Sequence, residues 1–109
     1  MSKQKRPIKL IKIIDEDFKI SKKKGNGILK FLAFEDEKGK LVKYSLAYIN
    51  HHICHADNGR VLGYDNNHGY HHRHYMGSVQ KIDFISFDNI KNFFETEWRE
   101  IHEKNQAKK

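Results

Sequence analysis

Apolar and polar side chains alternate most regularly between residues 42 and 48. Successive side chains of an extended chain point to opposite sides, so this segment would carry its large apolar groups on one side. The pattern predicts a β-strand whose buried face is formed by Val42, Tyr44, Leu46 and Tyr48. Four further segments are apolar or β-branched and are also predicted as strands: residues 8–14, 28–34, 60–65 and 79–85.

Two of the assignments stay open. Residues 8–14 also fit a short amphipathic helix, and residues 50–55 could extend the central strand or pair with the next one. Glycine and asparagine mark turns at residues 25–27, 35–40 and 57–59. These connections are shorter than the crossover of about a dozen residues that parallel strands need. Neighbouring strands are therefore expected to pair antiparallel.

A helical repeat follows Ser86. Ser86 is a suitable N-cap residue, and Asp88 would lie favourably in the first helical turn. The apolar positions that follow recur at helical spacing and predict an amphipathic helix over residues 87–104, with an aromatic stripe that faces the core: Ile90, Phe93, Phe94, Trp98 and Ile101. The expected architecture is α+β, an antiparallel sheet of about five to six strands with this helix packed on one face.

Length and composition indicate one folded domain. A chain of 109 residues suffices for one modest core, and we expect a single domain over residues 1–109 with a basic arm at about residues 1–7 and a frayed tail at residues 105–109. No apolar run approaches the roughly 20 residues that span a bilayer, so no membrane association is expected. The first residues do not resemble a secretory signal. A single cysteine, Cys54, fits a reducing cytoplasm.

The positive charge is concentrated near the start of the chain. The net charge is +7, and residues 1–24 hold nine Lys/Arg and three acidic residues. One interpretation is a solvated arm that keeps the protein soluble. The other is a surface that attracts phosphate and raises the rate of encounter with nucleic acid.

Histidine dominates the segment from residue 64 to residue 75. His68, His71, His72 and His74 surround Arg73 there. Imidazole is the side chain that exchanges protons near neutrality, with an ordinary pKa of roughly 6.5. This segment is therefore where we expect the chemistry of the protein.

The predicted catalytic residues are two histidines with an arginine and an acid. On a strand, His72 and His74 would share one face and Arg73 would take the other, whereas a loop imposes no such separation. Repulsion between two imidazoles favours one neutral and one charged ring, the pair that cleavage of RNA through a 2′-hydroxyl requires. Arg73 would hold the phosphate, and Asp65 would orient a histidine.

Aromatic and amide side chains of the same segment are candidates for substrate binding. Tyr64, Tyr70 and Tyr75 could stack on unpaired bases. The predicted substrate-binding set is Tyr64, Asn66, His68, His71 and Tyr75.

A metal site and a purely structural role are the alternatives. His51, His52, Cys54 and His55 could bind zinc together with the later histidines, but their spacing matches no known zinc finger. His52 and Cys54 could share a face through alternation. In the structural alternative, the histidines only hydrogen-bond one another and solvent. The favoured expectation is that no metal and no cofactor are needed.

The chain resembles the TumE family, small proteins that are toxin components of bacterial and archaeal toxin–antitoxin pairs. The residues that carry the resemblance are 44–48 (Tyr-Ser-Leu-Ala-Tyr), 61–66 (Val-Leu-Gly-Tyr-Asp-Asn), His68-Gly69, His72-Arg73-His74 and the closing segment 84–98. The resemblance covers about residues 28–104. It implies a cytoplasmic partner, usually a helix-turn-helix DNA-binding antitoxin, and a functional set made of Asp65, Asn66, His72, Arg73 and His74.

The leading hypothesis is a toxin of a type II pair that acts on RNA as a metal-independent ribonuclease. Its expected partners are a cognate helix-turn-helix antitoxin and an RNA substrate, in the cytoplasm, and a homodimer is left open. The rival hypothesis is a non-catalytic module that docks on RNA or on its antitoxin, and a third is a histidine-based metal-binding protein.

Overall fold

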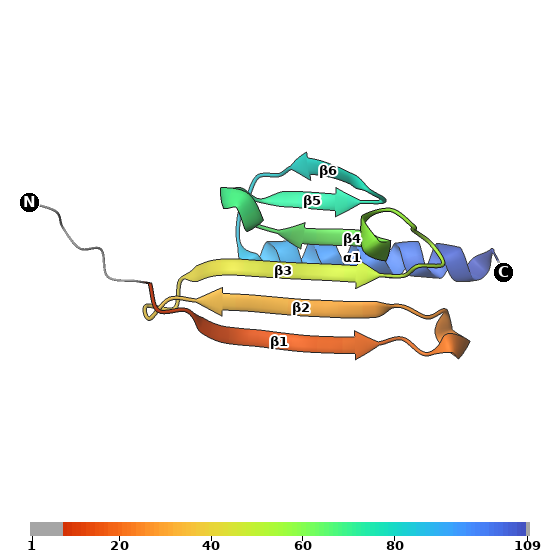
Figure 1. Cartoon of the computed structure of the whole chain (residues 1–109), viewed down its shortest axis with the longest axis horizontal. Coiled ribbons are helices and arrows are strands. Elements are labelled where there is room, and N and C mark those ends of the chain that lie inside the picture. Colours follow the sequence, from red (N-terminus) through yellow and green to blue (C-terminus); the bar gives the residue numbers. More distant parts are fainter. Residues whose placement is uncertain (1–7, 109) are drawn as a thin grey trace, which may run out of the picture.

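A computed structural model describes residues 8–108 of the chain. It contains one sheet and one long helix (Figure 1). Short 3₁₀ turns at Lys22–Lys24, Asp57–Gly59 and Asn67–Gly69 lie in the connections. The strands and the helix are β1 (Ile11–Lys19), β2 (Ile28–Glu35), β3 (Leu41–Ile49), β4 (Arg60–Asp65), β5 (His72–Tyr75), β6 (Ser78–Lys81) and α1 (Phe87–Ala107).

The six strands lie in the sheet in the order in which they occur in the chain. Every neighbouring pair is antiparallel, as the short connections predict. The helix α1 packs against β3 and β4 and lies behind the sheet in Figure 1. The expected α+β fold, an antiparallel sheet with a C-terminal helix on one face, is confirmed.

The core lies between α1 and the middle strands. Tyr44, Leu46 and Tyr48 of β3 are buried, as the alternation predicts, and they meet Ile90 and Phe94 of α1 in one cluster. Burial of each such side chain stabilises the fold by about 1.5–3 kcal/mol. The middle of the sheet and α1 are therefore the rigid part of the molecule, on which the site is built.

The register of β4 and β5 decides which side chains face the helix. Asp65 lies opposite His72, and Tyr64 lies opposite Arg73. The Tyr64 hydroxyl donates a hydrogen bond to Glu97 of α1, so Tyr64 and Arg73 face the helix. Because side chains alternate along a strand, Asp65 and His72 face the other side of the sheet, where no helix of residues 8–108 packs.

The two edge strands differ most from the prediction. The first strand covers Ile11–Lys19 instead of residues 8–14 and continues through three acidic residues. It pairs only with β2, so nearly all its side chains are exposed and burial imposes no alternation on them. At the other edge, β6 ends at Lys81 instead of continuing to residue 85. The alternative of a short helix over residues 8–14 is wrong, since residues 11–14 are part of β1.

The helix begins where the sequence predicts and ends later. The Ser86 hydroxyl accepts a hydrogen bond from the Asn89 N–H at 3.0 Å, which confirms Ser86 as the N-cap. The helix continues to Ala107, beyond the predicted end at residue 104, and includes residues 105–107 that were expected to fray. Phe93 departs from the predicted stripe because half of its surface is exposed. The predicted basic arm at residues 1–7 lies outside the described residues.

Candidate functional site

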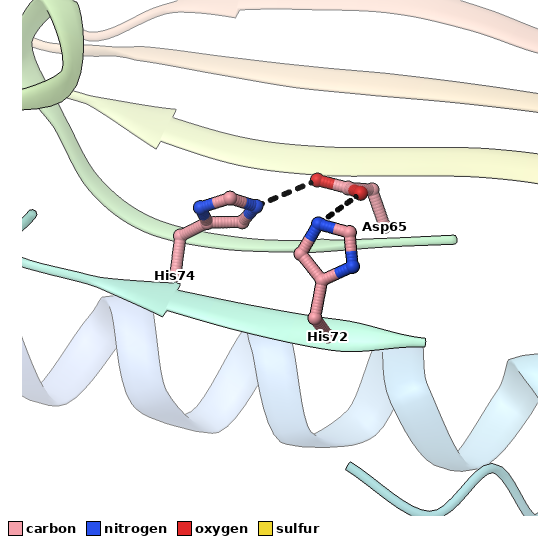
Figure 2. A group of neighbouring side chains, drawn as sticks. All are labelled: Asp65, His72 and His74. Carbon is pink, nitrogen blue, oxygen red and sulfur yellow. Dashed lines mark hydrogen bonds and ion pairs between the residues drawn. The ribbon is translucent and has the colours of Figure 1, made fainter. Parts of the chain in front are cut away.

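One carboxylate joins two imidazoles on the face of the sheet opposite α1 (Figure 2). His72 Nε2 lies 2.8 Å from Asp65 Oδ1, and His74 Nε2 lies 3.0 Å from Asp65 Oδ2. All three side chains are buried. β4 supplies Asp65 at its last residue, and β5 supplies both histidines at alternate positions. The expected convergence of these three residues is therefore present.

The hydrogen-bond partners of the two rings differ. His72 Nδ1 lies 3.1 Å from the Tyr70 carbonyl oxygen, so each nitrogen of His72 lies beside an oxygen atom. His74 Nδ1 lies 3.1 Å from Nη2 of Arg60. A guanidinium can only donate, so His74 Nδ1 accepts and its Nε2–H donates to Asp65. These partners make His74 a neutral imidazole.

The surroundings of His74 support its neutral form. Burial lowers the pKa of His74 first, and the Arg60 guanidinium lowers it further, although the Asp65 carboxylate acts in the opposite direction. The pKa of His74 therefore lies below its ordinary value. At neutral pH this ring is a base, and its Nδ1 lone pair accepts a hydrogen bond from Arg60.

Arg60 is the charged residue of the pocket lining that sequence reasoning missed. Its Nε donates to Asp57 Oδ2 at 2.7 Å, and its Nη1 lies 3.6 Å from Asp65 Oδ2. A Cβ atom at Gly63 would lie 2.8 Å from Arg60 Cδ, so the absence of a side chain at Gly63 leaves room for the arginine. A glycine inside a strand often marks such a close approach. Gly63 was the one signal in the sequence that could have led to Arg60.

A pocket of about 420 Å³ opens over the cluster. It combines the charged and imidazole groups just described with aromatic and amide side chains from the β4–β5 connection. The Arg60 guanidinium lies beside the carboxylates of both Asp57 and Asp65. Its lining is formed by Arg60, Asp65, Asn67, His68, Tyr70, His72, His74 and Val79.

The structure separates Arg73 from the two histidines. Arg73 Nη2 donates to Glu97 Oε2 of α1 at 2.5 Å, and the guanidinium lies over the Tyr75 ring at 5.0 Å. Arg73 belongs to a strand, β5, and not to a loop. Because side chains alternate along a strand, the Arg73 side chain points toward the helix, opposite to His72 and His74. Arg73 therefore cannot reach a phosphate held in the pocket, contrary to the expectation from sequence.

Four of the five predicted substrate-binding side chains lie elsewhere. Tyr64 is buried beneath α1, and burial and Glu97 raise its pKa. The Asn66 amide accepts from the Tyr44 N–H and donates to the Val42 carbonyl, so it holds the connection to β3. His71 stacks on a phenylalanine on the helix side and Tyr75 packs on Arg73. Of the predicted set, His68 lines the pocket.

Asp65, His72 and His74 are also the group of the described residues that could hold a metal ion, with ligand atoms within 4.8 Å of one another. A histidine that binds a metal usually donates its second ring N–H to an acceptor. His72 has such a partner in the Tyr70 carbonyl, but His74 Nδ1 faces the donor Arg60. Arg60 therefore lies where a metal-bound His74 would usually have an acceptor, although Asp57 Oδ2 lies 3.7 Å from the same nitrogen.

The earlier histidines do not join this group. His52 is exposed in a turn, while Cys54 is buried and its thiol donates to the Ala56 carbonyl at 3.4 Å. The chain turns over residues 51–53, so strand alternation does not apply and the alternative that it places His52 and Cys54 on one face falls away.

No helix within residues 8–108 is both long and apolar enough to cross a membrane.

Fold and site together define a small α+β protein that carries a histidine–carboxylate cluster on the side of its sheet away from the helix. The model of the family described as toxin TumE matches residues 12–105, which is nearly the whole chain. The protein therefore belongs to the TumE toxin family, and the resemblance drawn from the sequence is confirmed. Membership of a toxin family implies an antitoxin partner in general. No curated protein and no solved structure matches the chain.

Proposed function

We propose that this protein is the toxin of a type II toxin–antitoxin pair and cleaves RNA without a metal ion. The observation that carries the proposal is the single carboxylate that holds two imidazoles beneath an open pocket. The cognate antitoxin would be a helix-turn-helix DNA-binding protein, and the pair would act in the cytoplasm. The net charge of +7 favours encounter with RNA.

His74 is the base of the proposed reaction. A phosphate that enters the pocket attracts the Arg60 guanidinium, which forms bidentate hydrogen bonds with phosphate oxygens. In the structure, Nδ1 of His74 lies 3.1 Å from Arg60 Nη2. Movement of Arg60 toward the phosphate frees this nitrogen. Nδ1 then accepts the proton of the ribose 2′-hydroxyl, and the 2′-oxygen attacks the adjacent phosphorus.

His72 is the acid. As the bond between phosphorus and the 5′-oxygen breaks, the imidazolium of His72 gives one proton to the leaving 5′-oxygen. The products are a 2′,3′-cyclic phosphate and a 5′-hydroxyl, and the proton taken up by His74 balances the proton lost by His72. Asp65 stays ionised and keeps both rings in position through its two oxygens.

Cleavage of labelled RNA tests the proposal. Wild-type protein should cut RNA with or without EDTA, and the double variant His72→Ala/His74→Ala should lose cleavage and growth inhibition while it remains folded. His52→Ala is the matched control, because His52 is exposed and outside the pocket. Growth inhibition by a well-folded double variant would refute the assignment, and cleavage abolished by EDTA would indicate a metal at the cluster instead.

The second candidate is a module that binds RNA or its antitoxin without turnover. Large apolar side chains that are about half or more exposed favour it, because exposed apolar surface is available for docking: Ile8, Phe18, Val79, Ile85 and Phe93. This candidate predicts tight association and no cleavage product in the same assay.

A further inference from the structure

His68 holds an unfavourable backbone conformation at the mouth of the pocket. Its φ is 68° and its ψ is 20°, in the left-handed region. Glycine and asparagine adopt this region with the least strain, and residues in such conformations gather at functional sites. Either residue would keep this backbone conformation, so a substitution at this position tests the imidazole itself.

The His68 side chain contributes no hydrogen bond within residues 8–108. It is exposed, and its ring lies nearly parallel to that of His72 with the two centroids 6.4 Å apart. Tyr70, two residues later, is also well exposed, and its ring centroid lies 5.0 Å from that of His72. Two accessible aromatic rings thus border the pocket on the side of the β4–β5 connection.

Asn67 completes this side of the pocket. Its side chain lines the pocket, while its backbone N–H donates to Asp65 Oδ1 at 3.1 Å. The amide side chain offers both a donor and an acceptor, as the hydrogen-bonding edge of a nucleobase does. The pocket volume of about 420 Å³ falls within the range of roughly 300–1,000 Å³ that small-molecule sites show.

We infer that Asn67, His68 and Tyr70 form a nucleobase subsite. The base beside the cleaved phosphate packs against the rings of His68 and Tyr70, and the Asn67 amide hydrogen-bonds its edge. Stacking on aromatic side chains is the usual means by which proteins hold unpaired bases. The inference rests on the proposed function, whose reacting groups line the other side of the same pocket, and it extends that function to recognition of the base.

The variant His68→Asn separates this role from a structural one. Asparagine relieves the left-handed strain, so the variant should unfold at a higher temperature than wild type. It should bind adenosine or uridine 3′-monophosphate at least about fivefold more weakly, because stacking is lost. Met76→Asn is the matched control. Met76 also has a positive φ, 49°, and it precedes Gly77 in the β5–β6 turn outside this pocket, where Asn-Gly is favoured.

Two measurements test the nucleobase subsite. They are calorimetric titration with the nucleoside 3′-monophosphates and with ribose 5-phosphate, and thermal unfolding of each variant. The inference predicts that wild type binds the nucleotides more tightly than ribose 5-phosphate and that Met76→Asn gains stability without losing nucleotide affinity. Equal affinity of wild type for nucleotide and ribose phosphate would overturn it, as would unchanged nucleotide affinity or lower stability in His68→Asn. Nucleotide binding by a protein that leaves RNA intact would uphold the subsite and refute the proposed cleavage.

Discussion

At the scale of the residue, the cluster owes its asymmetry to Arg60 rather than to the two histidines. The rings share one carboxylate through the same nitrogen, Nε2. What distinguishes them is the partner of Nδ1, which is a carbonyl for His72 and a guanidinium for His74. In the proposed reaction, Arg60 therefore distinguishes the base, His74, from the acid, His72.

The variant Arg60→Gln tests this role. Because the guanidinium lowers the pKa of His74, its removal should raise that pKa, as a histidine-resolved NMR titration would measure. Loss of the phosphate contact should lower RNA cleavage by about 10²–10³-fold. Arg99→Gln is the control, since Arg99 pairs with Glu95 on the exposed surface of α1. An unchanged His74 pKa in Arg60→Gln would contradict the role given to Arg60.

At the scale of the element, one glutamate links the helix to two strands. Glu97 of α1 accepts hydrogen bonds from Tyr64 of β4 and Arg73 of β5. Both donors lie on the face opposite the pocket. Arg73 thus holds α1 on the sheet. The sheet lies between Arg73 and the pocket that contains His72 and His74.

Replacement of Arg73 by Ala should therefore affect the fold more than the reaction. Glu97 would lose a charged partner in a partly buried place, and the free energy of unfolding should fall by about 1–3 kcal/mol. The folded variant should still cleave RNA to within a few-fold of the wild-type rate. Urea unfolding and single-turnover cleavage measure the two effects. If the variant had normal stability but greatly reduced cleavage, Arg73 would instead hold the phosphate, as the sequence predicted.

The elements that the sequence predicted well are those with one buried face. The alternation in β3 and the apolar repeat of α1 both follow from packing against the core. The edge strands β1 and β6 have exposed faces, so no pattern fixed their ends. The face of the sheet on which Arg60 lies could not be inferred from alternation, for a related reason. A register shift between β3 and β4 at Tyr48/Ile49 interrupts the alternation from which its face could have been inferred.

The candidate site was only partly accessible to such reasoning. His72, His74 and Asp65 could be grouped because alternation on a strand was one of two stated options, and β5 adopts it. The same alternation turns Arg73 away, which could not be decided while a loop was still an option. Tyr64 was assigned to the substrate by its chemistry alone, whereas the register of β4 buries it.

At the scale of the whole molecule, the partly buried His71 and the buried His74 make stability depend on pH. Burial lowers the pKa of His71, with a further effect of His72, and the pKa of His74 is lowered as well. Both rings therefore bind protons less readily in the folded state than in the unfolded chain, where the pKa is about 6.5. Their neutral forms stabilise the fold fully above that value, and this contribution is lost as the pH falls through the lower folded values.

The melting temperature should accordingly fall between about pH 7.5 and pH 5. For the variant His71→Gln/His74→Gln the decline should be shallower, because neither side chain can take up a proton. His55→Gln, which changes an exposed histidine, should keep the wild-type slope. Scanning calorimetry across this pH range measures the three slopes. Parallel curves for the double variant and wild type would mean that other groups set the dependence.

The order of the strands has a consequence for handling the toxin. Each strand pairs with its neighbours in the chain, so most strand pairs form between segments that are close in sequence. Topologies of this kind fold faster than those that pair distant segments. A preparation stripped of its antitoxin in denaturant should therefore recover its native state on dilution, without a helper protein.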